Sequence, residues 1–149
     1  MQNLTPQQRI LLVEDSPEDV VTAKRNLLQS RLRNPVEVCE TGQLALDYIF
    51  QRQSFSDPSL APIPGVILLD LNLPDMSGLE ILTILKQHPV HQLIPVIVMT
   101  SSLDERDFEE SRQAGAATYL SKPVDFQNFF QAIQQLQGFC FELMIFPEP

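Results

Sequence analysis

The chain has 149 residues, about the size of one domain, and its 44% hydrophobic and 19% charged residues are typical of a globular protein rather than a disordered one. The formal net charge of −9, with no cluster of Lys and Arg, argues against a nucleic-acid partner, because binding to phosphates needs a positive surface. No apolar run reaches the roughly 20 residues of a membrane helix, and the N-terminus MQNLTPQQR lacks the pattern of a secretion signal, so we expect a cytoplasmic protein with no membrane partner.

Five short apolar runs, each bounded by polar or turn residues, predict five strands. The runs are apolar throughout rather than at alternate positions, which is typical of strands covered on both faces in a parallel sheet. They span residues 10–13, 36–38, 66–69, 94–99 and 118–120.

Segments with helical spacing follow the strands. Ser16 and Pro17 fit the N-cap and first turn of the first helix, and Ser77 opens a third one. The helix after Asp104 has the weakest apolar stripe, and the last helix, capped by Asp125, has the strongest. The apolar positions of these helices are Val20, Ala23, Leu27 and Leu28, then Ile81, Leu82 and Leu85, then Phe108, and finally Phe126, Phe129, Phe130, Ile133 and Leu136.

This alternation of strands and helices predicts an open, doubly wound α/β sheet with right-handed crossovers. We expect residues 1–149 to form a single domain, with a core over about 8–137. Residues 53–64 contain three prolines and no periodicity, and are expected to form a long exposed loop. Residues 138–149 form an unusually apolar C-terminal extension.

Residues that could take part in chemistry lie where the predicted strands end. Glu14 and Asp15 follow the first strand, Asp70 ends the third, Thr100 ends the fourth and Lys122 follows the fifth. Ligands of open α/β sheets bind outside the carboxyl ends of the strands. If the first and third strands are neighbours, their three carboxylates crowd into one pocket.

Crowded carboxylates repel one another and therefore attract a cation. An acidic, partly open site of oxygen ligands suits Mg²⁺. A carboxylate such as Asp70 can attack a phosphoryl group when its charge is neutralised, and Lys122 and the Thr100 hydroxyl could contact phosphoryl oxygens. Taken singly, each residue has an ordinary structural interpretation, such as Glu14 and Asp15 capping the first helix, but their joint position favours one site.

Four motifs strengthen this interpretation: ILLVEDSPED, ILLDLNLPDMSG, PVIVMTSS and AGAATYLSKP. In identity, order and strand-end position, the sequence resembles the receiver domain of bacterial two-component response regulators over roughly residues 8–137. The resemblance implies a flavodoxin-like (βα)5 fold, a five-stranded parallel sheet with strand order 2-1-3-4-5.

The resemblance also implies roles for single residues. Asp70 would accept a phosphoryl group from a histidine kinase and, with Asp15 and the backbone carbonyl of Asn72, would coordinate Mg²⁺. Glu14 would complete the metal site, and Lys122 would pair with the phosphoryl group. Such a protein is a self-catalysed phosphoacceptor rather than an enzyme that turns over a separate substrate.

The resemblance also implies roles for a switch pair, two tuning positions and one peptide bond. Thr100 and Tyr119 match its switch pair, in which the hydroxyl moves toward the phosphoryl group and the aromatic ring turns inward. Asn72 and Ser102 match positions that tune autodephosphorylation, and the bond between Lys122 and Pro123 would be cis.

Two departures from the usual pattern, the loop at 53–64 and the C-terminal extension, resemble the stand-alone regulators paired with cyanobacterial phytochrome kinases. A run of large side chains after the last helix also predicts self-association, with a homodimer formed through that helix and the tail. The alternative is that the tail folds back on its own domain. The run comprises Phe139, Cys140, Phe141, Leu143, Met144, Ile145 and Phe146.

Four other interpretations deserve comparison. An aspartyl-nucleophile phosphatase of the haloacid dehalogenase kind needs an acid-base Asp at position 72, where this chain has Asn72. A flavin module needs a Gly-, Ser- and Thr-rich phosphate loop, but EDSPED follows the first strand. A calcium loop fails because Pro74 and Asp75 take the places of a ligand and a glycine. A degenerate receiver that serves only as an interaction module remains open.

Overall fold

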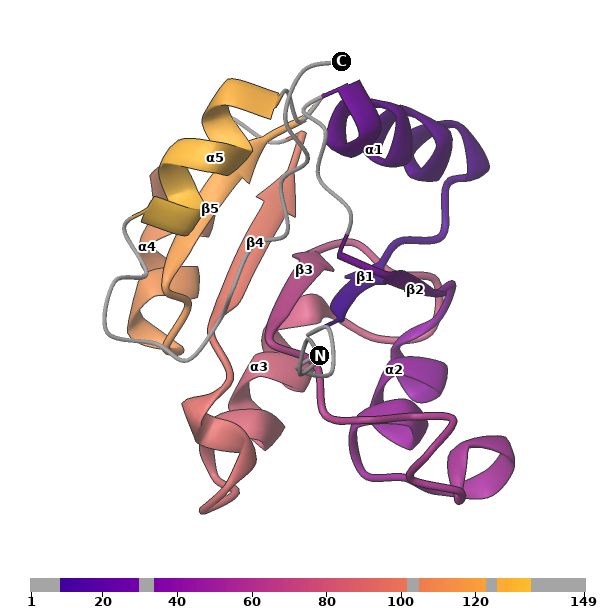
Figure 1. Ribbon diagram of the computed structural model, residues 1–149. Helices are drawn as coiled ribbons and strands as arrows, with labels where there is room; N and C mark the ends of the chain where they lie inside the picture. Colours follow the sequence, from indigo (N-terminus) through magenta and orange to yellow (C-terminus); the bar gives the residue numbers. More distant parts are fainter. Residues whose placement is uncertain (1–8, 30–33, 102–104, 123–125, 135–149) are drawn as a thin grey trace.

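The structure, a computed structural model, describes residues 9–29, 34–101, 105–122 and 126–134 (Figure 1). The strands are β1 (Ile10–Val13), β2 (Val36–Cys39), β3 (Val66–Asp70), β4 (Val96–Thr100) and β5 (Thr118–Ser121). The helices are α1 (Pro17–Gln29), α2 (Gly42–Ile49), α3 (Gly78–Lys86), α4 (Glu105–Gln113) and α5 (Phe126–Gln134), with short 3₁₀ helices η1 (Gln53–Phe55) and η2 (His91–Leu93).

The five strands form one parallel sheet in the order β2-β1-β3-β4-β5, which confirms the predicted fold class and topology. β4 begins two residues later than predicted and ends at Thr100. Ile94 is instead the C-cap of η2, where its N–H donates to the carbonyl of His91 at 3.1 Å.

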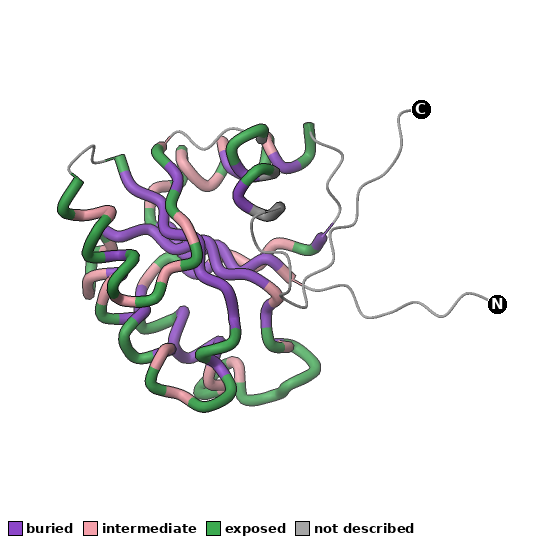
Figure 2. The backbone as a smooth tube through the Cα atoms, turned by 90° about the vertical axis from the view of Figure 1, so that its left-hand side faces the viewer, coloured by how far each residue is buried: buried purple, intermediate pink, exposed green. Residues whose placement is uncertain are grey.

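Helices cover both faces of the sheet (Figures 1 and 2). Alternate residues of each central strand face opposite ways, so Leu12 and Leu68 pack with α1 and α5 while Leu11 and Leu69 pack with α2 and α3. Both layers exclude water from the central strands, where every residue of β1, β3 and β4 is buried. This explains the continuous apolar runs in the sequence.

The first helix has the predicted start but a narrower buried face. Ser16 Oγ accepts from the N–H of Asp19 at 3.3 Å, as an N-cap does. Ala23 and Leu27 are buried against the sheet, whereas Leu28 is 60% exposed. Leu28 fits the helical spacing but faces away from the sheet, because one further residue turns the side chain about 100° around the helix.

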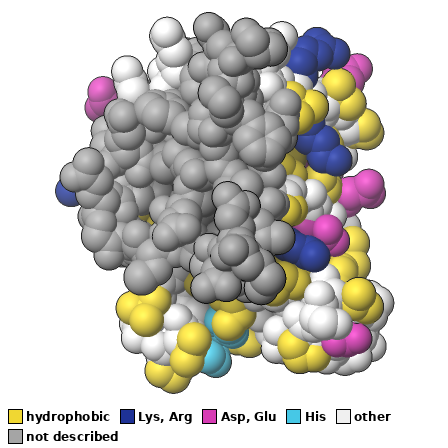
Figure 3. All heavy atoms as spheres, viewed as in Figure 1, with side chains coloured by type: hydrophobic (Ala, Val, Ile, Leu, Met, Phe, Trp, Pro, Cys, Tyr) yellow, Lys and Arg dark blue, Asp and Glu magenta, His cyan; other side chains and the backbone are white. Residues whose placement is uncertain are grey.

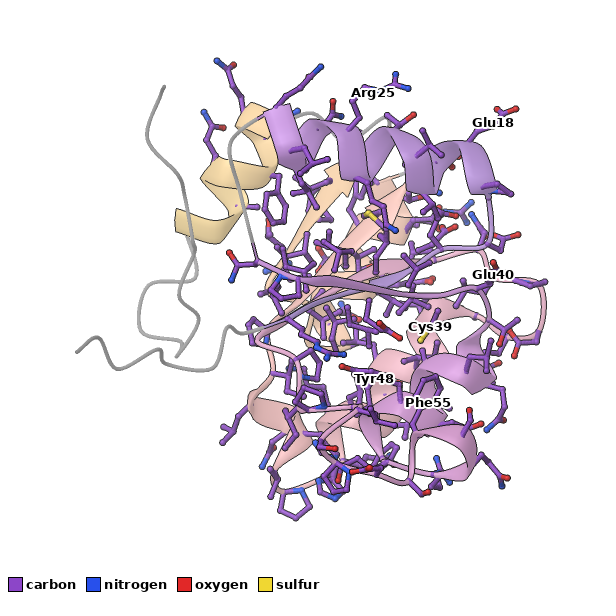
Figure 4. The ribbon with its side chains drawn as sticks, turned by 45° about the vertical axis from the view of Figure 1, so that its right-hand side comes forward. Glu18, Arg25, Cys39, Glu40, Tyr48 and Phe55 are labelled. Carbon is purple, nitrogen blue, oxygen red and sulfur yellow. The ribbon has the colours of Figure 1, made fainter. Side chains whose placement is uncertain are left out.

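The predicted long loop at 53–64 is largely exposed, but it is attached to the domain. The ring of Phe55 packs edge-on against Tyr48 with centroids 5.2 Å apart (Figure 4). Ala61 is fully buried, and its carbonyl accepts from Nε2 of Gln51 at 3.0 Å. The loop is therefore packed against the domain through the contacts of Phe55 and Ala61.

The remaining helices differ in how firmly they are packed. Ser77 caps α3 as predicted, since its Oγ accepts from the N–H of Leu79 at 3.1 Å, and the three predicted apolar positions of α3 are fully buried. In α4 only Ser111 is buried. Phe129 of α5 is buried.

Several predictions lie outside the described residues or side chains. They are the Asp125 cap, the side chains of Phe126, Phe130 and Ile133, the position of Leu136, Ser102, the Lys122–Pro123 bond and the whole extension 138–149. Among the described helices, none combines the length and apolarity that crossing a membrane requires.

A cluster of histidine and aromatic side chains lies at the amino edge of the sheet, just before β4. At this edge His88 and His91 stack with ring centroids 4.2 Å apart, and Phe50 meets His91 edge-on at 4.9 Å. Figure 3 shows histidine side chains among hydrophobic ones at the lower end of the view. Val90 and Leu93 are exposed apolar residues of the same segment. The acidic residues predicted to form the site lie instead at the opposite, carboxyl edge of the sheet.

Two adjacent leucines test the orientation of α1. We expect Leu27→Ala to lower the free energy of unfolding by about 2–4 kcal/mol, because it leaves a cavity against the sheet. Leu28→Ala is the matched control and should change it by less than about 0.5 kcal/mol. Urea unfolding followed by circular dichroism measures both values, and equal losses would contradict the described orientation.

Candidate functional site

The carboxyl edge of the sheet gathers the acidic residues predicted to form the site. β1 and β3 are direct neighbours, with Val13 opposite Leu69, so the residues that follow lie side by side. Glu14 and Asp70 are 1% and 4% exposed, whereas Asp15 is exposed. One carboxylate oxygen from each of these three residues lies within 4.8 Å of the other two.

Lys122 supplies the positive charge of this cluster. It follows β5, and its backbone N–H donates to the carbonyl of Thr100 at 2.9 Å, which fixes the start of the side chain beside β4. Its ammonium lies 2.5 Å from Oε1 of Glu14, 3.0 Å from Oδ2 of Asp19 and 3.1 Å from Oδ2 of Asp70. Residues from three strand ends and one helix thus meet at a single nitrogen atom.

The loop after β3 holds the second oxygen of Asp70. The N–H of Asn72 donates to Oδ1 of Asp70 at 3.0 Å, and the N–H of Gly78 donates to the carbonyl of Leu71 at 2.9 Å. A Cβ atom on Gly78 would lie 2.5 Å from the backbone oxygen of Asp70, so only glycine allows α3 to begin this close to the site. Asn72 itself is exposed, which leaves it beside the open side of the cluster.

Burial and charge shift the protonation of two members. Burial raises the pKa of Glu14 to about 7, with the neighbouring Asp70 adding to the rise and Lys122 opposing it. Burial alone would lower the pKa of Lys122, but its hydrogen bonds to Glu14, Asp19 and Asp70 outweigh that effect and raise it. Lys122 is therefore a permanent cation, while Glu14 can exchange a proton near neutral pH.

The two residues of the predicted switch pair lie in different surroundings. Thr100 is fully buried at the end of β4, next to the site. Tyr119 of β5 is 43% exposed and stacks on Phe108 of α4, with ring centroids 4.2 Å apart and planes 12° from parallel. Thr100 therefore lies beside the buried site, and Tyr119 lies on the surface formed by α4 and β5.

Sequence reasoning missed two acidic residues. Asp19 was not singled out, although it lies in the first turn of α1, shortly after the acidic pair Glu14 and Asp15. Asp75 was considered only as an obstacle to a calcium loop, yet its carboxylate accepts from the N–H groups of Gly42 and Gln43 at 2.8 and 2.9 Å. It caps α2 from the β3–α3 loop, and no local signal indicates that contact.

The described residues fit a small divalent cation. Glu14, Asp15 and Asp70 are the one group of three metal-binding side chains within the described part of the chain. All three offer oxygen, the ligand type that Mg²⁺ prefers, and the exposed Asp15 leaves one side open to water or substrate oxygens. A cation bound by the cluster would therefore place positive charge next to the carboxylate of Asp70.

Comparisons with known proteins point the same way. Residues 10–134 match the response regulator receiver domain family. Rcp1, a response regulator of Synechocystis sp., is 33% identical over 142 residues, which cover 95% of each chain. The similarity to Rcp1 therefore extends over nearly the whole length of both proteins.

Solved structures extend the comparison. The bacteriophytochrome response regulator AtBRR is 39% identical, with a TM-score of 0.82 over 94% of this chain and 99% of its own. The Mn²⁺-bound form of Rcp1 has a TM-score of 0.72 over 95% and 99%. The phosphorylated cyanobacterial phytochrome response regulator RcpA is 30% identical, with a TM-score of 0.75 over 92% and 98%.

The raised pKa of Glu14 predicts a pH effect on stability in EDTA. The folded protein keeps this proton up to about pH 7, whereas the unfolded chain releases it near the ordinary value of 4.5. The folded state therefore binds more protons in this window, and the free energy of unfolding falls as the pH rises through it. Glu14→Gln should lack this decline, a difference on the order of 3 kcal/mol between pH 4 and pH 8.

Urea unfolding at both pH values measures this difference. Glu80→Gln, on the exposed side of α3, is the matched control and should keep the wild-type pH dependence. Parallel pH profiles for wild type and Glu14→Gln would contradict the assignment of the proton to Glu14.

Proposed function

The chain belongs to the response regulator receiver family, and we propose that Asp70 accepts a phosphoryl group from a histidine kinase in the presence of Mg²⁺. One observation carries this proposal: the ammonium of Lys122, which follows β5, contacts the carboxylates of both Asp70, which ends β3, and Glu14, which follows β1. A buried carboxylate with a cation beside it and an acidic cluster around it suits phosphoryl transfer better than a purely structural role.

The metal site would use oxygen atoms from both strand ends. Asp15 and Asp70 would coordinate Mg²⁺ through their carboxylates, Asn72 through its backbone carbonyl, and Glu14 would complete the acidic set. When bound, the ion supplies charge neutralisation to the phosphoryl oxygens. The proximity of the three carboxylates supports this ligand set.

The transfer itself would be carried out by the chain's own residues. A carboxylate oxygen of Asp70 attacks the phosphorus atom of a phosphohistidine, an O–P bond forms, and the P–N bond to the kinase breaks, leaving its imidazole to take a proton. Lys122 pairs with one phosphoryl oxygen, and the Thr100 hydroxyl donates to another. The phosphoryl group stays on Asp70 and no separate substrate is turned over, so the protein acts as a phosphoacceptor rather than as a turnover enzyme.

The rival interpretations fit the site less well. In a phosphatase of the haloacid dehalogenase kind, the residue at position 72 must carry a proton, and the Asn72 amide cannot. A flavin phosphate would meet Glu14, Asp15 and Asp19 where it needs positive or N–H-rich surroundings. A receiver that only binds partners would not need Lys122 among three carboxylates, since burying such charges is costly unless they have a use.

Phosphorylation would switch the surface formed by α4 and β5. Thr100 would move toward the phosphoryl group, and Tyr119 would leave Phe108 and turn inward. The weak burial of α4 supports this part of the proposal, because elements that move are drawn from the less stable parts of a fold. The stacked Tyr119–Phe108 pair would be the contact that opens.

The partners follow from the same proposal. The donor would be a histidine kinase in the cytoplasm, and the phytochrome response regulators among the similar structures favour a phytochrome as that kinase. A homodimer through the last helix and the C-terminal tail also stays a proposal, since its apolar run lies outside the described residues.

Phosphorylation from a small donor tests the central proposal. With acetyl phosphate and Mg²⁺, intact-mass analysis should show one added phosphate on the wild-type chain, and none in EDTA or in Asp70→Asn. Asp57→Asn, in the exposed loop, is the matched control and should be labelled like the wild type. Label that persists in Asp70→Asn would rule out Asp70 as the acceptor.

Amide hydrogen exchange tests the switch. Beryllofluoride, which mimics the phosphoryl group, should change exchange in α4 and β5 but leave α2, which contacts β2 at the other edge of the sheet, unaltered. Thr100→Val keeps the shape of the side chain and removes its hydroxyl, so it should abolish most of this change. Identical protection in α4 and β5 with and without beryllofluoride would contradict the switch.

A further inference from the structure

Asp19 is the member of the ion cluster to which the family resemblance gives no role. It lies in the first turn of α1, with Oδ2 3.0 Å from the ammonium of Lys122. An ammonium has three N–H groups, and here it faces three carboxylates: Glu14, Asp19 and Asp70. Each carboxylate can take one N–H, so Asp19 completes the coordination of Lys122.

The other two partners of Lys122 are also needed elsewhere. Oδ2 of Asp70 contacts the ammonium and Oδ1 accepts from the N–H of Asn72, so both oxygens of the proposed nucleophile are engaged. A cation that binds Asp70 and Glu14 competes directly with Lys122 for these oxygens. The ammonium must then be held by another group, or it opposes the cation.

Asp19 is placed to be that group. It is outside the three-carboxylate cluster, and its side chain is 44% exposed, so its charge remains available when the cluster is filled. A cavity of about 20 Å³, enough for roughly one water molecule, lies beside the ammonium and is lined by Leu12, Glu14, Asp19, Thr22, Ala23, Met99 and Lys122. The ammonium therefore has both an acceptor and room on the α1 side.

We infer that Asp19 is a positioning residue, which draws the ammonium of Lys122 off Asp70 and Glu14 and so lets the divalent cation bind them. The inference rests on the proposed function of the site. It predicts that Asp19 acts through Lys122. Removal of the Asp19 carboxylate should lower the affinity for the cation rather than the reactivity of Asp70.

The test combines calorimetric Mg²⁺ titration with a double-mutant cycle. Asp19→Asn should weaken Mg²⁺ binding roughly three- to tenfold, a range that allows for solvent screening of a half-exposed pair. In a Lys122→Met background, the same substitution should change the affinity by less than about twofold, because no ammonium remains to be held. An equal loss in both backgrounds would overturn the inference.

Glu18→Gln is the matched control for general charge and for the helix dipole. Glu18 lies in the same first turn of α1 and points outward from its start (Figure 4). Its removal should change the Mg²⁺ affinity by less than about twofold, because an exposed charge is screened by salt. A loss as large as that of Asp19→Asn would mean that any acidic residue of this turn serves, which also overturns the inference.

A second measurement serves if Lys122→Met does not fold. The Mg²⁺ dependence of phosphorylation by acetyl phosphate should shift to higher Mg²⁺ in Asp19→Asn, with the wild-type rate recovered at saturation. A lower maximal rate at an unchanged midpoint would contradict the positioning role. If the wild-type chain takes no phosphate on Asp70 at all, the proposed function itself fails, which is a different result from either of these.

Discussion

Burial of two acidic side chains at neighbouring strand ends is the constraint on which the site depends. Glu14 and Asp70 are almost completely buried, and when both are ionised, at about 4 Å with an effective dielectric near 20, they repel by roughly 4 kcal/mol. Lys122 offsets this repulsion, and it can do so only because β4 brings the end of β5 within reach of β3. The strand order is therefore also the condition for a stable acidic site, and the site remains short of positive charge.

The fold and most of the site could be predicted because their signals are local. Continuous apolar runs indicate strands covered on both faces, and the residues after each run fall at one edge of any parallel sheet. The exposure of Leu28 could not be predicted, because helical spacing alone does not say how wide the buried face is. Asp19 and Asp75 escaped notice because their partners, Lys122 and the N-terminus of α2, are distant in the sequence. Contacts of this kind follow from tertiary packing, which periodicity does not report.

The two helices that follow β3 and β4 on one face of the sheet are not packed equally tightly. α3 begins directly against Asp70, where Gly78 leaves no space for a side chain, so this helix fixes the loop that holds Asp70. Nearer the β5 edge, α4 buries only Ser111 and contacts the sheet edge through Phe108 and Tyr119. A tightly packed helix beside a weakly packed one allows a local change at the site to alter the surface of α4 and β5 alone.

Lys122 links these two regions through its own backbone. Its ammonium neutralises the buried carboxylates, and its N–H is bonded to the carbonyl of Thr100, so the ends of β4 and β5 are tied to the charge state of the site. Tyr119 lies three residues earlier on β5, the edge strand of the sheet. A new negative group on Asp70 would pull on the ammonium, and β5, which precedes Lys122, has a neighbouring strand on one side only among the described residues. An edge strand can adjust with less loss of packing than β1 or β3, which explains why a response would appear at β5 and α4 rather than in the centre of the sheet.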